Sequence, residues 1–336
     1  MKYPFTWMKV ASVALIGVLA GCSGGSDSPE ETTTAGKPAV KTSLAFVTNG
    51  TADFWSYAEA GVREAEAEFG DVEVQFKQGD GTPIFQRRTV DNLIVKGIQG
   101  LAISPTSPKD QTAILNKWAE KVPLICQDSD APDSKRIAYL GTDNVAAGRQ
   151  CGELVKEALP EGGKIMVFVG LKDAQNAIER FQGLKEALEG TKVEVLGLRT
   201  DNTDYTKARS NAETTITKYP DIAGLVGLWG YNPPAILEAV KAQNKLGQIK
   251  IIGFDEDERT LTGIDAGHIH GTVVQNPYKF GYESVKVLRA LAQGKTGVDA
   301  GIPENGQIII PTKVLRKGDG GEYLAYCKSL KEKARK

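Results

Sequence analysis

The sequence predicts an α/β fold with two doubly wound lobes, each built on a parallel sheet and joined to the other by a hinge of several strands. Short apolar runs alternate with helical patterns along 44–140, and the same alternation restarts at 164 and continues to 254. Such alternation is typical of parallel sheets with helices on both faces. A chain of 336 residues is also long for one compact core and suits two lobes of ordinary size.

The expected strands are short apolar runs, and the expected helices carry apolar residues at helical spacing. In the first half, strands fall at 44–47, 72–76, 101–103, 124–126 and 137–140, with helices at 55–69, 85–96 and 109–121. In the second half, strands fall at 164–169, 193–198, 225–228 and 249–254, with helices at 174–189, 205–218 and 234–244. A short helix after 255, a strand at 269–275, a helix at 277–293 and an apolar run at 308–310 follow.

The last of these elements are expected to complete the two sheets by recrossing between the lobes. We expect 43–142 with 276–305 to form the first lobe, and 143–275 with 306–322 to form the second. The remaining stretch, 323–336, is a basic, helix-like tail. Its lysines are expected to form a solvated face rather than a binding surface.

The first 21 residues are expected to be a secretion signal. Lys2 and Lys9 give a positive start, 10–20 is an apolar stretch too short to span a bilayer, and LAGC closes it. This resembles a bacterial lipoprotein signal, which implies cleavage before Cys22 and lipid on its sulfur; a plain secretory signal or an uncleaved anchor are the alternatives. The next stretch, 22–42, is rich in Ser, Gly, Thr, Glu and Pro, as in a flexible tether.

Composition excludes some classes of function. With 41% hydrophobic and 25% charged residues, the chain has the make-up of a globular protein. Its formal net charge of -1 argues against a nucleic-acid partner, because such proteins carry a basic excess.

The cysteines and histidines give no clear metal or catalytic pattern. Cys126, Cys151 and Cys327 are too few for a disulfide scaffold, and Cys126 and Cys151 are expected to be small buried hydrophobes rather than a bridge. His268 and His270 share one strand face, where they could hold a metal, but we expect them to be exposed strand residues that flank a turn. No nucleophile elbow, phosphate-binding glycine loop or metal motif occurs, so we expect no enzyme activity, no cofactor and no metal.

Two adjacent aromatic residues, Phe54 and Trp55, follow the first strand at the start of a helix. A core position there needs only one aromatic, so we expect the pair to face a ligand; packing between helix and sheet is the alternative. Sugars have apolar C–H faces that stack on aromatic rings, and hydroxyl groups that need hydrogen-bond partners. Thr48 lies in the same loop and is a further candidate.

The unit of a strand followed by Asp occurs twice, in PLICQD ending at Asp128 and IKIIGFD ending at Asp255. Ligands of parallel sheets bind beyond the carboxyl ends of the strands, although Asp also serves as an ordinary turn residue there. Arg180 and Gln275 are the other polar candidates. A carboxylate can accept two hydroxyl hydrogen bonds and a guanidinium can donate two, and such charge-assisted bonds are strong.

Several ordered motifs between about 43 and 315 resemble the periplasmic sugar-binding proteins of the ribose-binding type, the solute receptors of ABC importers. They are FW at 54–55, ISPTSPKD at 103–110, VPLICQDSD at 122–130, GTDNVAAGRQCGEL at 141–154, NAIERFQGLKEAL at 176–188, TDYTKA at 203–208, IGFDED at 252–257 and VVQNPYKFG at 273–281. The resemblance implies the type I fold of periplasmic binding proteins.

The resemblance also implies roles for single residues. Phe54 and Trp55 would stack on the sugar, and Tyr205 would add an aromatic from the second lobe. Asp128, Arg180, Asp255 and Gln275 would bind its hydroxyls. Asn232 lies near the position where the family has an Asn-Asp pair.

One departure bears on the ligand. Ser129 stands where ribose receptors carry an arginine, and the loss of those donors disfavours ribose. Trp55, in place of a second Phe, offers a broader platform. Both differences favour a pyranose or a cyclic polyol.

Together these expectations describe a monomeric, lipid-anchored protein of the periplasm or cell surface. It would capture a monosaccharide or cyclic polyol between its lobes, close around it, and deliver it to an ABC permease. The alternative is a receptor of the same fold that signals to a membrane sensor kinase or chemoreceptor. Repressors share the fold, but they carry a DNA-reading domain where this chain has its signal.

Overall fold

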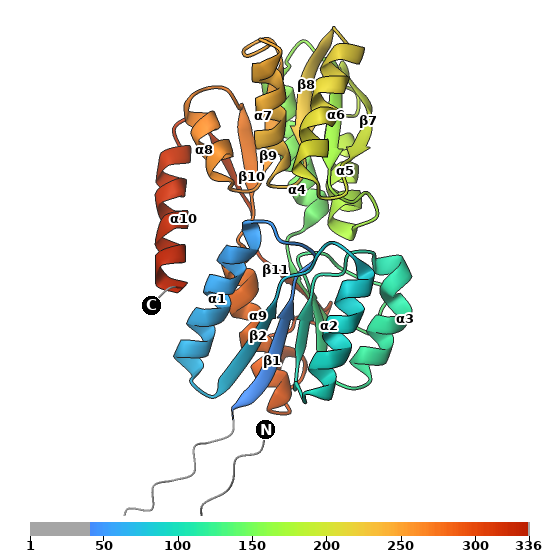
Figure 1. The fold of residues 1–336 in the computed structure, drawn as a ribbon, viewed down its shortest axis with the longest axis vertical. Helices are drawn as coiled ribbons and strands as arrows, with labels where there is room; N and C mark the ends of the chain where they lie inside the picture. The colour runs from blue at the N-terminus through green and yellow to red at the C-terminus, as the bar shows by residue number, and fades with distance from the viewer. Residues whose placement is uncertain (1–40, 335–336) are drawn as a thin grey trace, which may run out of the picture. The chain divides into compact units, whose positions relative to one another are not determined.

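The computed structural model describes residues 41–334. The expected signal, Cys22 and nearly all of the expected tether lie outside the described residues. The described part forms a single compact unit that contains two six-stranded sheets (Figure 1).

The first sheet has the strand order β11-β5-β4-β3-β1-β2, and every pairing in it is parallel. Its strands are β1 (Thr42–Val47), β2 (Val72–Lys77), β3 (Leu101–Ile103), β4 (Leu124–Gln127), β5 (Ala138–Gly141) and β11 (Gln307–Ile309). The helices of this lobe are α1 (Phe54–Phe69), α2 (Pro83–Val95), α3 (Pro108–Ala119) and α9 (Pro277–Ala292), followed by a 3₁₀ turn at Gly297–Ala300. Its central strands are buried on both faces, as their continuous apolar sequences predict.

The second sheet repeats the arrangement in the order β12-β10-β9-β8-β6-β7. Its strands are β6 (Gly163–Val169), β7 (Val193–Thr200), β8 (Ile222–Gly227), β9 (Lys250–Phe254), β10 (Gly271–Val274) and β12 (Lys313–Arg316). The helices are α4 (Asn144–Ala158), α5 (Gln175–Leu188), α6 (Tyr205–Lys218), α7 (Asn232–Ala242) and α8 (Glu258–Asp265). Only the edge strand β12 is antiparallel to its neighbour, β10. The predicted fold of two parallel α/β lobes is confirmed.

The chain crosses between the lobes three times, and the last crossing differs from the prediction. It passes from β5 to α4, from β10 to α9, and from β11 to β12. The sequence placed 306–322 in the second lobe, but β11 pairs with β5 of the first sheet, so that boundary is wrong for β11. A three-residue apolar run predicts a strand without saying which sheet accepts it. At the other end, Thr42 already pairs with Val72, one residue inside the expected tether.

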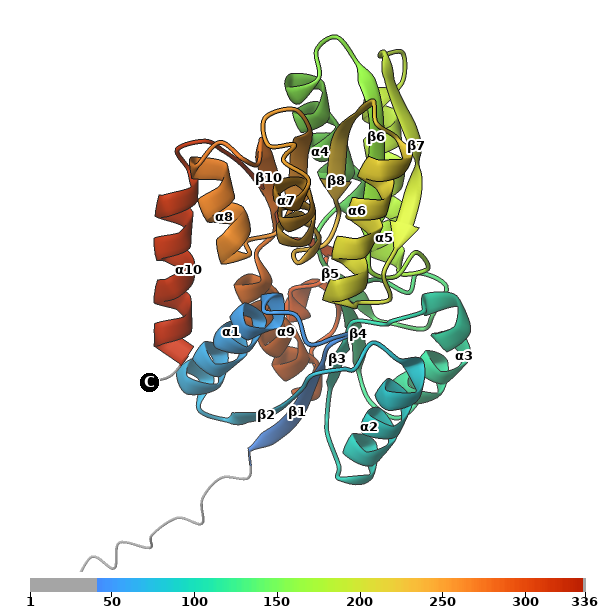
Figure 2. The same cartoon turned by 45° about the horizontal axis from the view of Figure 1, so that its top comes forward.

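The tail forms α10 (Gly320–Ala334), which packs on α1 of the first lobe and on α8 of the second (Figures 1 and 2). Cys327 and Leu330 are buried against Tyr57 of α1. The lysines are not simply a solvated face, because Lys331 pairs with Asp53 at 2.6 Å and Lys328 pairs with Glu258 at 3.0 Å.

Helices α1 and α9 pack with their backbones almost in contact, and glycine makes this possible. A Cβ atom at Gly281 would lie 1.9 Å from the carbonyl oxygen of Ala58, and one at Gly61 would lie 1.9 Å from that of Tyr278. This packing fixes α1, whose first residues are Phe54 and Trp55.

We therefore expect Gly281→Ala to lower the free energy of unfolding by about 1–3 kcal/mol, because the helices must separate to admit a methyl group. Urea unfolding followed by circular dichroism measures this loss. Lys286→Ala, on the exposed face of the same helix, is the control and should change stability by less than about 0.5 kcal/mol. Equal stability of Gly281→Ala and the unaltered protein would contradict the account of this contact.

Candidate functional site

The two strand-plus-Asp units have the same backbone geometry. Asp128 after β4 and Asp255 after β9 both adopt left-handed φ angles, 59° and 64°. Each donates its backbone N–H to the neighbouring strand, Asp128 to Leu140 at 3.1 Å and Asp255 to Val273 at 2.9 Å. Asp is among the few residues other than Gly that visit this conformation readily. The repeated sequence thus places one buried carboxylate at the carboxyl edge of each sheet.

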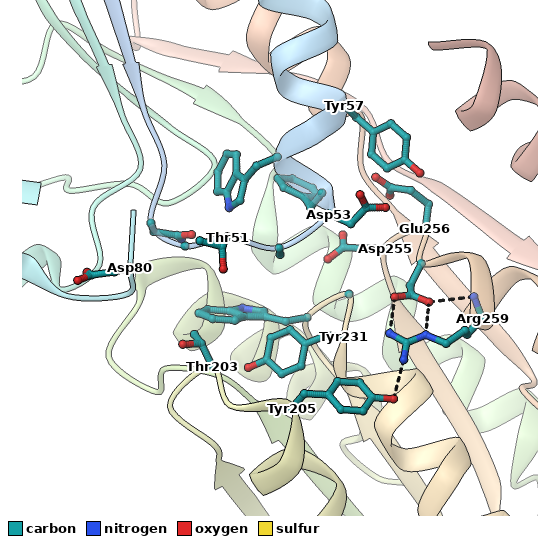
Figure 3. Close-up of a pocket in the computed structure, with 18 residues that line it drawn as sticks. Thr51, Asp53, Tyr57, Asp80, Thr203, Tyr205, Tyr231, Asp255, Glu256 and Arg259 are labelled. Atoms are coloured by element: carbon teal, nitrogen blue, oxygen red, sulfur yellow. Dashed lines mark hydrogen bonds and ion pairs between the residues drawn. The ribbon is translucent and has the colours of Figure 1, made fainter. Parts of the chain in front are cut away.

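A cavity of about 310 Å³, which we call the large chamber, is lined by residues of both lobes (Figure 3). A small chamber of about 50 Å³ shares part of its wall, including Phe54, Trp55 and Asp255. Predicted residues that line one or both chambers are Phe54, Trp55, Asp128, Arg180, Tyr205, Asp255 and Gln275. The structure therefore brings most of the predicted set together.

The aromatic pair belongs both to the chamber walls and to the core of the first lobe. Phe54 and Trp55 line both chambers and meet edge to face, with ring centroids 4.9 Å apart. Trp55 is also buried in the core of the first lobe, where its ring lies 6.3 Å from that of Phe46. Its substitution would thus alter both the core and the chamber wall.

The second lobe supplies aromatic residues of its own. Trp229 and Tyr231 line both chambers, and Tyr205 lines the large one. Tyr205 is held by hydrogen bonds. Its hydroxyl donates to Glu238 at 2.7 Å and accepts from Arg259 at 2.8 Å (Figure 3). The indole N–H of Trp229 is buried and has no hydrogen-bond partner within the described residues.

Arg180 is held firmly but is left with one free donor. The side chain is only 1% exposed; its Nε donates to Asn144 at 3.0 Å, and its Nη1 donates to the carbonyl of Leu228 at 2.8 Å. The guanidinium also lies 4.6 Å above the ring of Phe254. Nη2 has no partner among the described residues. Arg180 also lines the small chamber.

The small chamber also holds carboxylates and amides. Asp128 accepts from Ser104 at 2.8 Å, and more distantly from Asn49 and Asn176 at 3.4 Å each. Burial raises the pKa of Asp128 to about 6, although Arg180 and the Ser104 hydrogen bond oppose this rise. Burial likewise raises the pKa of Asp255. The amide oxygen of Asn176 is buried without a partner within the described part, which leaves an acceptor for a ligand.

Gln275 links the site to the hinge. Its Nε2 donates to Asp255 at 2.8 Å, and its Oε1 accepts from the hydroxyl of Thr142 at 2.8 Å. Thr142 lies at the first crossing between lobes and Gln275 at the second. These hydrogen bonds therefore connect the carboxylate of Asp255 to both connecting segments.

Three predicted residues line neither chamber. Thr48 is buried, donates to the carbonyl of Gly50 at 2.7 Å and accepts from the N–H of Gly79 at 2.9 Å, so it shapes the loop before α1. Asn232 donates to Asp201 at 2.9 Å and accepts from the N–H of Trp229, which positions that indole. Ser129 is buried and lines neither chamber.

Sequence reasoning missed several residues of the chamber walls. They are Asn49, Asp53, Tyr57, Asp80, Asn176, Thr203, Trp229, Tyr231, Glu256, Asp257 and Arg259. Two of them had a usable signal, because Asn176 opens the NAIER motif and Glu256 follows Asp255 directly.

Cysteines and possible metal ligands complete the description. Cys126, Cys151 and Cys327 are free and buried, so Cys126 and Cys151 are not bridged. Within residues 41–334, no group of three or more His, Cys, Asp or Glu side chains could hold a metal ion. Over the same range, no helix is both long enough and apolar enough to cross a membrane.

Comparison with known proteins now identifies the family. The model of the periplasmic binding protein domain matches residues 44–296. The chain belongs to this family. Its resemblance to the ribose-binding type is confirmed by the ribose import binding protein RbsB of Haemophilus influenzae. The two sequences are 26% identical over 230 residues, which cover 68% of this chain and 77% of the relative.

Other similar proteins are named for different ligands. The xylitol-binding protein of Mycolicibacterium smegmatis is 22% identical over 290 residues, 85% of this chain and 80% of its own. A similar solved structure is that of an ABC transporter solute-binding protein from Burkholderia graminis in complex with D-arabinose. It superposes with a TM-score of 0.77 at 26% identity, and the match covers 84% of this chain and 98% of that one.

We expect the ligand-free protein to lose stability as pH rises through about 6. A buried acid with a raised pKa favours folding most below its ordinary pKa, and this contribution is lost as pH rises through the folded-state pKa. Asp128, whose pKa moves from 3.8 to about 6, contributes up to about 3 kcal/mol to this loss. Asp201, whose pKa is also about 6, adds to it.

Denaturant unfolding at pH 5 and pH 8 measures the part of this loss that falls above pH 5, about 1.4 kcal/mol for Asp128. Asp128→Asn should flatten the profile, whereas Asp133→Asn, at an exposed position, should leave it unchanged. If the protein is more stable at pH 8 than at pH 5, burial does not raise the pKa of these two acids as described.

Proposed function

We propose that this protein is a lipid-anchored, extracytoplasmic sugar-binding protein that captures a monosaccharide or cyclic polyol between its lobes and delivers it to an ABC importer. The observation that carries the proposal is the free donor of Arg180, which is fixed in a chamber whose walls also hold two carboxylates and aromatic side chains of both lobes. A ring with apolar C–H faces and a rim of hydroxyls fits this combination of surfaces.

The mechanism is closure of two lobes around a ligand. A sugar that contacts both lobes favours the closed form, because it binds that form more tightly than the open one. Arg180 and Asp255 come from the second lobe, while Asp128, Phe54 and Trp55 come from the first. The closed form would then be recognised by the permease. We assign no catalytic role and no cofactor, in keeping with relatives that are named for binding and import.

An importer is preferred to a sensor as the partner, because the RbsB relatives are named as import binding proteins. The expected location is the periplasm or cell surface. The protein would act as a monomer, held at the membrane by lipid on Cys22.

The test is calorimetric titration of the full chain, in detergent, with pentoses, hexoses and cyclic polyols. We expect Arg180→Ala to weaken binding of the best ligand about 10- to 100-fold, because charge-assisted hydrogen bonds contribute roughly 1.5–3 kcal/mol. Arg180→Lys should restore binding only in part, since it keeps the charge but loses the paired donors.

Arg149→Ala is the matched control, because Arg149 is an exposed arginine of α4 that pairs with Glu186 on α5. It should bind as the unaltered protein does. Failure of every sugar and polyol to bind the unaltered protein would overturn the proposed function, and full affinity in Arg180→Ala would remove Arg180 from the site.

Lipidation has its own test. We expect labelled palmitate to be incorporated into the full chain in a bacterial host, and Cys22→Ser to abolish labelling, because no other thiol lies in the signal box. Cys327→Ser, which alters a buried thiol, should remain labelled. Absence of label in the unaltered protein would contradict the lipid anchor and leave a plain secretory signal or an uncleaved anchor.

A further inference from the structure

Three carboxylates gather on one side of the large chamber: those of Asp53, Asp255 and Glu256 (Figure 3). Asp53 immediately precedes α1 of the first lobe, and the other two follow β9 of the second. Asp80 and Asp257 also line this chamber, whereas Arg259 is the one cationic residue of its wall within the described chain. The wall therefore carries an excess of negative charge.

Glu256 differs from its neighbours in having no partner. Asp53 pairs with Lys331, Asp255 accepts from Gln275, and Asp257 pairs with Arg259. Glu256 is only 3% exposed, and neither of its carboxylate oxygens has a hydrogen-bond partner among the described residues. Burying an unpaired carboxylate costs several kcal/mol, so an ionised Glu256 needs a positive charge nearby.

The groups around Glu256 do not supply that charge in full. Burial, together with the charges of Asp255 and Asp53, raises the pKa of Glu256 well above its usual range, and Lys331 opposes this rise. Other titratable groups near it come from α1 and α10; they are Tyr57, Tyr323, Tyr326 and Cys327. Like Glu256, all of these can only be neutral or negative.

Aromatic residues line the same chamber: Tyr57, Tyr205, Trp229 and Tyr231. The faces of Trp and Tyr rings attract cations, and ring faces beside carboxylates are the surroundings in which proteins bind ammonium groups. A neutral sugar would use the rings but leave Glu256 without a partner. A sugar that carries an amino group would use both.

We propose that the ligand is an amino sugar or an aminated polyol, with its ammonium group beside Asp255 and Glu256 and its hydroxyls toward Arg180 and Asp128. This proposal rests on the proposed function and names the ligand class of the same site. The ammonium supplies the counter-charge that Glu256 lacks, and the polar groups of the small chamber hold the rest of the ring.

The test compares matched pairs of sugars by calorimetry with the full chain at pH 7: D-glucose with D-glucosamine, D-galactose with D-galactosamine, and D-mannose with D-mannosamine. In at least one pair, the amino sugar should bind about tenfold or more tightly than its neutral partner. Glu256→Gln should reduce this preference about tenfold. The substitution keeps the shape of the side chain, so the fold should be retained.

Glu258→Gln is the matched control, because Glu258 is an exposed glutamate two positions along that pairs with Lys328 and lies outside both chambers. It should keep the full preference for the amino sugar. Equal or tighter binding of neutral sugars, pentoses or polyols by the unaltered protein would overturn the amine proposal and leave the proposed function standing. An unchanged preference in Glu256→Gln would also overturn it, whereas failure of every sugar to bind would overturn the proposed function itself.

Discussion

The cost of burying charge governs the construction of the binding chambers. Asp128, Arg180 and Asp255 are nearly inaccessible to water, yet Arg180 forms no direct hydrogen bond to either carboxylate within the described structure. Each is held instead by neutral groups, such as Ser104 for Asp128 and Gln275 for Asp255. Neutral partners fix the geometry without neutralising the charges, so part of the electrostatic cost remains until a ligand binds.

The fold provides this arrangement by repeating one sheet topology in both lobes. Each sheet ends one central strand with an Asp in the left-handed conformation, and the hydrogen bond from its N–H to the next strand is the same in both. Close contact between α4 and α5 then sets Arg180. A Cβ atom at Gly148 would lie 2.2 Å from the carbonyl oxygen of Arg180, and one at Gly183 would lie 2.0 Å from that of Val145. Backbone packing thus determines where the guanidinium lies.

Sequence was sufficient for the parts of the molecule that follow from local pattern. Alternation of strand and helix predicted both sheets, and the repeated strand-plus-Asp unit predicted Asp128 and Asp255. Sequence was insufficient where tertiary pairing decides the outcome: β11 joined the first sheet through β5, which its three residues could not reveal. Ser129 and Asn232 were chosen by position in a motif, yet the turn after β4 buries the first, and the second is used to hold Trp229. Glu256 was missed because it stands out only by lacking a hydrogen-bond partner. That lack depends on how α1 and α10 pack around it, which the sequence does not reveal.

The central claim is that the unsatisfied polar groups of the chambers are reserved for a ligand that touches both lobes. A crystal structure of the protein with the ligand found by calorimetry tests this most directly. The account predicts a ring in contact with Phe54 or Trp55 on one side and with Trp229 or Tyr231 on the other, and a hydrogen bond from Nη2 of Arg180 to the ligand. A ligand bound to one lobe only, with Nη2 of Arg180 still unpartnered, would contradict it.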